Sequence, residues 1–305
     1  MGAMVFFSMN DMLFKYFSDT YALHQLVFIR CSIAFAMILG GVMVFGTGLG
    51  QLKTQRLPAH LARGFLVVLA NMSFFTAVAS MPLAEAVAIF FVSPLLITVF
   101  SVIFLKEKVG PWRWLAIVLG FVGVLVIVQP GASAFQIASL LPILSATCYA
   151  GLHMMTRVLG RTDSTPALAF YVQIAFIITS VGIGLAVGDG RFADQTHPSA
   201  AFFFRAWAWP EVSDLPLLIL LGVCVGAGAY LISAAYRVSE AALVAPFEYV
   251  AMPFAIFWGI VLFNEWPNFS TWIGIALIVG AGLFMLWRER QVGKVQAAPV
   301  ARIRR

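Results

Sequence analysis

The chain has 305 residues, of which 62% are hydrophobic and only 10% are charged, and its formal net charge is +6. Soluble globular chains are about 25% charged, so this composition excludes a protein whose whole surface faces water. Most of the basic residues lie in short loops and in the C-terminal segment, which indicates contact with anionic lipid headgroups rather than nucleic acid. We therefore expect a protein embedded in a lipid bilayer, with no nucleic-acid partner.

The apolar runs predict an all-α polytopic membrane protein of about ten transmembrane helices. A bilayer core about 30 Å thick takes roughly 20 apolar residues of helix. Strands are excluded because the strands of membrane barrels are shorter and alternate polar with apolar residues. The predicted spans are residues 1–17, 23–45, 61–80, 83–105, 112–128, 137–158, 167–187, 215–236, 241–263 and 271–287.

The first predicted span is short, and Asn10, Asp11 and Lys15 interrupt its apolar sequence. Either the neighbouring helices shield a short first span, or the natural start codon lies upstream of Met1 and this helix is incomplete. We favour the second alternative.

The basic residues predict the orientation of the chain. With both termini placed on one side, that side receives fifteen of the 19 Lys and Arg residues, beginning with Lys53, Arg56 and Arg63, and the other side receives three. Loops rich in Lys and Arg stay in the cytoplasm. We therefore predict a multi-pass protein of the inner (plasma) membrane with both termini cytoplasmic.

Two stretches of the chain repeat one pattern. Pro94 lies in the fourth span and Glu107 follows it by 13 residues, whereas Pro253 lies in the ninth span and Glu265 follows it by 12. Repeats with an odd number of spans insert in opposite orientations. The pattern predicts two inverted five-helix repeats, residues 1–131 and 132–287, followed by a basic cytoplasmic tail at 288–305. Inverted repeats are typical of secondary transporters, whose substrate site lies near the midplane between the halves.

Over nearly its whole length the chain resembles the drug/metabolite transporter superfamily, in its EamA-type ten-helix branch. The resemblance rests on the two Pro…Glu segments, on the opening FFSMNDMLFKYF followed by Arg30, and on the APFEY stretch at residues 245–249. NDMLFK and APFEY are also similar to bacterial S-adenosylmethionine and riboflavin carriers. The resemblance implies a basket of helices around a cavity lined by spans 1, 3, 4, 6, 8 and 9. It also implies a small-molecule substrate: an amino acid, a nucleotide-like compound, a vitamin or a drug.

Ionisable residues inside spans are candidates for function, because a charge at the helix centre costs about 2.5–3.5 kcal/mol on insertion scales. Glu248 lies roughly 10 Å into its span, and we predict that it binds a substrate cation or takes up a coupling proton. Pro246 and Pro253 flank it. Since proline removes a backbone donor, these two residues and Pro94 are predicted to bend helices or to act in gating.

Asp11 and Lys15 are four residues apart and share one helix face. Asp11 therefore either faces the substrate or forms an internal ion pair with Lys15. Arg30 either binds an anionic group of the substrate or extends its long side chain toward the membrane surface. The other candidates for substrate binding, each with a structural role as the alternative, are Asn10, Asn71, Glu85, Tyr149, His153, Tyr230 and Tyr249. Glu107 and Glu265, at helix ends, are predicted to stabilise loops or gates.

Together these features predict a secondary transporter of small organic metabolites that works by alternating access, as a monomer or homodimer, without a cofactor. The alternatives are an integral-membrane enzyme acting on a lipid or prenyl substrate, and a channel. The sequence has no DDxxD, HExxH or GxSxG motif and no paired carboxylates, which disfavours the enzyme. A channel would favour a filter segment or repeated pore-lining residues, and a GxxxxGK[ST] loop for direct ATP use is absent.

Overall fold

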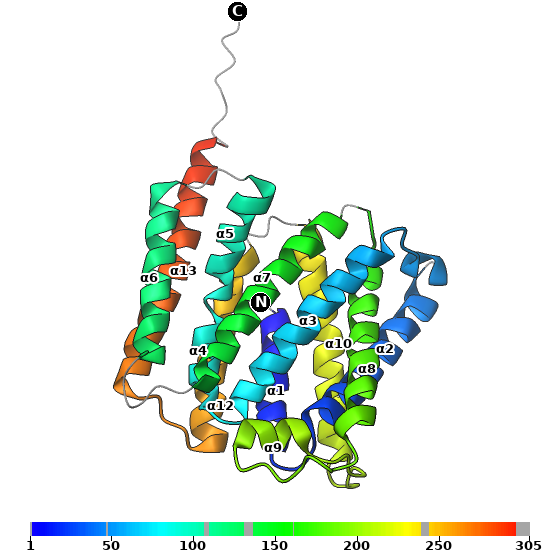
Figure 1. Ribbon diagram of the computed structural model, residues 1–305. Helices are drawn as coiled ribbons and strands as arrows, with labels where there is room; N and C mark the ends of the chain where they lie inside the picture. The colour runs from blue at the N-terminus through cyan, green and yellow to red at the C-terminus, as the bar shows by residue number, and fades with distance from the viewer. Residues whose placement is uncertain are drawn as a thin grey trace, which may run out of the picture.

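A computed structural model describes residues 2–46, 48–106, 110–130, 137–160, 162–238 and 244–296, and the regular secondary structure within these ranges is helical. Most helices stand side by side, and the short helix α9 lies across one end of the bundle (Figure 1). We call this end the α9 end. Glu107 lies outside the described residues.

The helices in chain order are α1 (Gly2–Phe17), α2 (Leu23–Phe45), α3 (Leu57–Val78), α4 (Leu83–Phe90), α5 (Ser93–Leu105), α6 (Pro111–Val128), α7 (Leu140–Leu159), α8 (Thr165–Val187), α9 (Pro198–Phe204), α10 (Leu215–Val238), α12 (Ala251–Phe263) and α13 (Phe269–Gln296). Short 3-10 helices are η1 (Leu49–Leu52), η2 (Ile137–Ser139) and η3 (Ala245–Val250).

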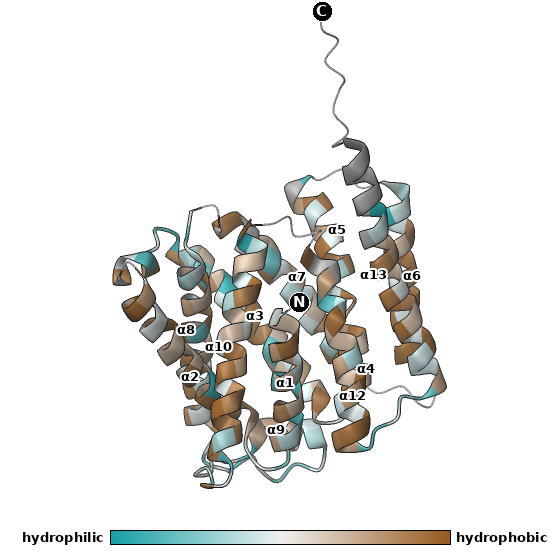
Figure 2. Ribbon diagram, turned by 180° about the vertical axis from the view of Figure 1, so that it is seen from behind, coloured by the Kyte–Doolittle hydropathy of each residue, from teal (hydrophilic) through white to brown (hydrophobic). Residues whose placement is uncertain are grey.

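The helices have the length and composition of membrane spans. Seven helical segments in the described ranges, counting α4 and α5 together, are long and apolar enough to cross a membrane, and two shorter apolar helices cover Phe247–Phe263 and Phe269–Met285. Figure 2 shows hydrophobic residues along the helices, whereas many hydrophilic ones lie in the connections at the two ends. The prediction of an all-helical, multi-pass membrane protein is confirmed for the described part of the chain.

Several helix boundaries differ from the prediction, two of them by four residues or more. Helix α3 begins at Leu57 rather than at residue 61, because Pro58 fits the first helical turn, where its missing N–H is not needed. Arg63, which the charge count placed with the cytoplasmic residues, lies in the second turn of this helix and is 3% exposed. Helix α13 continues to Gln296, so the first part of the predicted tail is helical.

Two of the predicted spans are broken near their prolines. Helix α4 ends at Phe90 and α5 starts at Ser93, because Pro94 has no N–H to donate to the Phe90 carbonyl. The ninth span begins as the 3-10 helix η3, which contains Pro246, and continues as α12 with Pro253 in its first turn.

Helices α5 and α12 end in the same way. Each has 13 residues, and each is followed by a residue in the left-handed conformation with φ 54° and ψ 32°, Lys106 after α5 and Asn264 after α12. Each N–H of these cap residues is hydrogen-bonded to the carbonyl five residues earlier, at Ser101 and Gly259 respectively. The two segments therefore share a length and a cap geometry.

The helix contacts occur in matching pairs. The α3–α7 contact matches the α1–α10 contact, and the α5–α7 contact matches the α1–α12 contact. In the same way, the α3–α8 contact matches the α2–α10 contact. Helices α6 and α13 form one edge of the bundle, and α2 and α8 form the other (Figure 1). The α6–α13 contact is close because Gly123 and Gly274 face each other, and a Cβ on either would come within 3 Å of the other's carbonyl oxygen.

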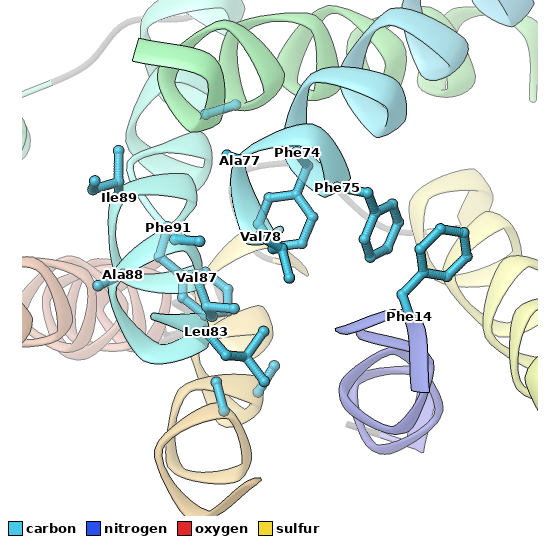
Figure 3. Close-up of a cluster of buried hydrophobic side chains, with 14 of the residues drawn as sticks. Phe14, Phe74, Phe75, Ala77, Val78, Leu83, Val87, Ala88, Ile89 and Phe91 are labelled. Carbon is cyan, nitrogen blue, oxygen red and sulfur yellow. The ribbon is translucent and has the colours of Figure 1, made fainter. Parts of the chain in front are cut away.

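Buried aromatic and aliphatic side chains of α1, α3 and α4 gather where these helices approach one another (Figure 3). The rings of Phe14 and Phe75 stack with centroids 3.9 Å apart, and both side chains are almost completely buried. Because this packing holds α1 against α3, it also positions the polar residues on the adjacent faces of these helices.

At the α9 end, Lys15 pairs with Glu265 and not with Asp11. Its Nζ lies 2.7 Å from Glu265 Oε1 and donates a hydrogen bond of 2.9 Å to the Met81 carbonyl. The other oxygen of Glu265 accepts a 3.0 Å hydrogen bond from the Leu83 N–H at the start of α4, where a negative charge is favourable. The α12–α13 connection is thereby joined to α1 and α4.

At the opposite end, Asp163 joins α3 to the connection between α7 and α8. Its Oδ2 accepts hydrogen bonds from His60 Nε2 at 2.6 Å and from Thr54 Oγ1 at 2.7 Å. Its carbonyl accepts a 3.1 Å bond from Arg237 Nε, at the end of α10. Burial raises the pKa of the Asp163 carboxyl, but hydrogen bonds from His60 and Thr54 outweigh this effect and hold that pKa below its usual value.

Replacing Asp163 by alanine is expected to destabilise the protein by about 1.5–3 kcal/mol, because the buried His60 and the half-buried Thr54 lose a charged acceptor. The thermal unfolding midpoint in detergent at pH 7 measures the effect. A carboxyl with a lowered pKa stabilises the fold fully above the ordinary aspartate pKa of about 4. The difference between the two proteins should therefore shrink only as the pH falls through the lowered pKa.

Asp194→Ala is the control for this substitution, because Asp194 is exposed in the connection before α9. Its unfolding midpoint should match that of the unmodified protein. Equal midpoints for Asp163→Ala and Asp194→Ala would contradict the role assigned to Asp163.

Candidate functional site

A cavity lies inside the bundle, and the space within it and its mouth amounts to about 1230 Å³. Most of the lining side chains are apolar. The polar ones are Ser8, Asn10, Asp11, Arg30, Arg63, Asn71, Ser145, Tyr149, His153, Gln173, Ser233 and Glu248. Helices α2 and α8 contribute Arg30 and Gln173, so these helices line the cavity in addition to the spans that the family resemblance implies.

One side of the cavity is built around Arg30, which is 1% exposed. Its Nη1 donates a 2.7 Å hydrogen bond to Asn10 Oδ1, and its Nη2 donates to Asn71 Oδ1. Asn10 in turn donates a 3.0 Å bond to Asp11 Oδ1. Three helices therefore converge on one guanidinium group, and the Asp11 carboxylate belongs to the same network.

Aromatic rings surround the Arg30 guanidinium. Its Cζ lies 4.4 Å from the centroid of the Phe14 ring, 5.1 Å from that of Phe75 and 5.6 Å from that of Phe176. A desolvated cation over aromatic faces gains about 2 kcal/mol. These rings and the two asparagines stabilise the charge where water is scarce, and Arg30 does not reach the membrane surface.

A second group of cavity residues is built around Glu248, which is 2% exposed. The Tyr236 hydroxyl donates a 2.5 Å hydrogen bond to Glu248 Oε1, and the Tyr149 hydroxyl also interacts with this carboxylate. The 3-10 conformation of η3 places Glu248 toward the cavity between α7 and α10. The carboxylate is therefore held by tyrosines at the wall of the cavity.

His153 completes this acidic group. Its ring stacks on Tyr236 with centroids 3.9 Å apart and meets the Tyr149 ring at 4.2 Å. Neither ring nitrogen has a hydrogen-bond partner among the described residues. The structure therefore brings Tyr149, His153 and Glu248 together, and it places Asn10, Asp11, Arg30 and Asn71 in the other group.

Three of the predicted candidates lie outside the cavity. Tyr249 donates a 3.2 Å hydrogen bond to the Phe91 carbonyl, and its ring occupies space beside Gly282 of α13. Tyr230 is 44% exposed on the outer face of the bundle, because one residue turns the helix by about 100° from the cavity-lining Ala229. Glu85 is half-buried in the first turn of α4.

Three important residues were not predicted from the sequence. Arg63 lines the cavity and donates to Thr156 Oγ1 and to the Leu168 carbonyl. Tyr236 binds Glu248, and Gln173 lies fully buried on the cavity wall. A polar residue in the middle of an apolar span was the available signal for Gln173.

A multi-pass helical bundle that encloses a cavity with opposite charges on its walls has the architecture of a membrane carrier for small molecules. The model of the EamA-like transporter family matches residues 1–129 and 136–287, and the chain belongs to this family. It is a transporter of the drug/metabolite transporter superfamily.

Two relatives illustrate the similarity. A riboflavin transporter of Brucella anthropi is 28% identical over 254 residues, which cover 83% of this chain and 85% of the relative. An S-adenosylmethionine uptake transporter of Rickettsia bellii is 27% identical over 284 residues, covering 93% of this chain and 90% of the relative. A solved structure described as "Crystal structure of protein" has the same fold, with a TM-score of 0.67, 19% identity, and coverage of 95% of this chain and 98% of that one.

Proposed function

We propose that the protein is a secondary transporter that carries a small organic metabolite across the cytoplasmic membrane by alternating access around its central cavity. The observation that carries this proposal is the presence of two buried charged groups in one cavity. Arg30 comes from the first half of the chain and Glu248 from the second. A solute bound between them contacts both halves, so relative motion of the halves changes its access to the two sides.

The proposed architecture is ten spans in two inverted five-helix repeats, with both termini in the cytoplasm. The two family matches, one to each half of the chain, support it. The helix contacts also support it. When each span is replaced by the equivalent span of the other half, α3 is replaced by α10 and α7 by α1, so the α3–α7 contact corresponds to the α1–α10 contact. The shared cap geometry of α5 and α12 agrees with the same replacement. The cytoplasmic side is then the end opposite α9, and the functional unit is a monomer or homodimer.

The first candidates for the substrate are riboflavin and S-adenosylmethionine, because the relatives carry these names. Both compounds combine a planar heterocycle with polar groups. The cavity offers aromatic walls that include Phe74, Phe90 and Tyr149, and charged groups at two places. Glu248 serves either as the counter-ion of a substrate cation or as the group that takes up a coupling proton. Asp11 and Arg30 form the opposite binding wall, and Pro94 and Pro253 mark the positions where the halves bend.

The purified protein in liposomes tests this proposal. Liposomes preloaded with unlabelled riboflavin or S-adenosylmethionine should take up the labelled compound in a saturable way, at least several-fold faster than liposomes without the internal solute. Counter-flow of this kind requires one site that is exposed alternately to the two sides. Linear, unsaturable uptake of every solute in a panel that also includes amino acids and nucleosides would contradict the proposal.

A further inference from the structure

Gln173 is a buried amide without a partner on the cavity wall. It lies in α8, is 0% exposed, and lines the cavity together with Ala169, Val172 and Phe176. These positions share one face of the helix. Neither the Oε1 nor the Nε2 atom of Gln173 has a hydrogen-bond partner among the described residues.

A second buried glutamine shows what an amide with a structural role looks like in this protein. Gln25 of α2 is 4% exposed, and both ends of its amide are paired with the backbone of Ala208. A buried polar group without a partner costs about 1–3 kcal/mol. The unpaired amide of Gln173, at the wall of a cavity, therefore indicates a hydrogen-bonding partner that enters the cavity.

The cavity that Gln173 lines favours a planar partner. Phe176, one turn further along α8, lies 5.6 Å from the Arg30 guanidinium, so Gln173 belongs to the Arg30 side of the cavity. Aromatic rings line the wall formed by α3, α4 and α7, with Phe90 centred 5.3 Å from Phe74 and 5.0 Å from Tyr149. Rings of this kind stack on flat, conjugated ligands.

We infer that Gln173 determines specificity by binding the edge of a planar heterocycle that presents a hydrogen-bond donor beside an acceptor. A glutamine amide offers one acceptor and one donor side by side, so it pairs twice with such an edge, as glutamine does with adenine. A carboxylate, with acceptors only, and an ammonium group, with donors only, each leave half of the amide unpaired. The inference rests on the proposed function and adds to it the chemical group that the site recognises.

Two pairs of ligands that differ only in this edge test the inference. Purine riboside lacks the exocyclic N–H of adenosine, and 3-methylriboflavin lacks the ring N–H of riboflavin. Dissociation constants of all four compounds are measured with the detergent-solubilised protein by calorimetry. In at least one pair, the unmodified protein should bind the compound with the complete edge about 10- to 100-fold more tightly.

In Gln173→Met, which nearly keeps the side-chain volume, the ratio of the two dissociation constants within that pair should fall to near one, because methionine cannot pair with the edge. Gln173→Leu, which also lacks both the donor and the acceptor, should lower it as well and serves if the methionine variant does not fold. Ser180→Ala is the control. Ser180 lies in the same helix, is 0% exposed and has an unpaired hydroxyl, but it lies outside the cavity, so the ratio should stay unchanged.

Each outcome bears on one of the two proposals. Ratios near one in both pairs for the unmodified protein, or a ratio that survives both Gln173 substitutions, would overturn the role of Gln173. Saturable counter-flow that continues beside such results leaves the transport proposal standing. Selective binding in detergent without any counter-flow would contradict the transport proposal and support the role of Gln173.

Discussion

Glu248→Gln is expected to lower the rate of uptake under an imposed pH gradient by about 10- to 100-fold while the protein still folds. The substitution keeps the shape of the side chain and an oxygen that accepts the Tyr236 hydrogen bond. It removes the charge, and hydrogen bonds to a charged group contribute about 1.5–3 kcal/mol. Both roles proposed for Glu248, counter-ion of a substrate cation and carrier of a coupling proton, need an ionisable carboxyl.

The pH dependence of transport separates these two roles. If Glu248 carries a coupling proton, the variant loses the stimulation by an imposed pH gradient but retains exchange at equal pH. If it binds a substrate cation, the variant has a raised KM in both conditions. Glu85→Gln is the matched control, because Glu85 is a second glutamate within a span but lies outside the cavity. Equal transport by both variants and the unmodified protein would contradict the role of Glu248.

Arg30→Ala is expected to destabilise the protein by about 3–5 kcal/mol, the range typical of removing one partner from a buried charged network. Asn10 and Asn71 lose the donors that bind their oxygens, and the space between Phe14, Phe75 and Phe176 becomes empty. We expect a low yield of folded protein and a large decrease in the thermal unfolding midpoint in detergent.

Arg30→Lys distinguishes the charge from the shape of the group. Lysine keeps the positive charge but cannot bind two asparagines with a planar fork or stack on the rings. It should therefore fold with an intermediate stability. Arg191→Gln is the control, because Arg191 is exposed and pairs with the exposed Asp189. An unfolding midpoint for Arg30→Ala equal to that of the control would show that Arg30 does not organise this side of the cavity.

Several features of the protein follow from local properties of the chain. Lipid is the main solvent of a chain with so few charges, and backbone hydrogen bonds within lipid are satisfied by helices. The breaks before Pro94 and around Pro246 follow from a missing N–H, a property of the residue itself. Glu248 lies in the cavity because a charge that deep inside a span needs polar partners.

Other features depend on which helices become neighbours. The i, i+4 spacing allowed Lys15 to pair with Asp11, but α1 packs against α12, and Glu265 reaches Lys15 from the following connection. Tyr230 and Tyr249 have the residue type of cavity hydrogen-bonders, yet the rotation of their helices directs them elsewhere.

The membrane-spanning helices and the breaks near the prolines of two spans were therefore determined by the sequence alone, because each depends on a residue and its near neighbours. The site was decided by the tertiary structure. Arg30 meets Asn10 and Asn71 across three helices, and Gln173, on a fourth, has no hydrogen-bond partner in the part of the chain that the structure describes. Such contacts depend on the rotation and register of packed helices, which are set by the sum of many weak side-chain contacts and not by any short pattern in the chain.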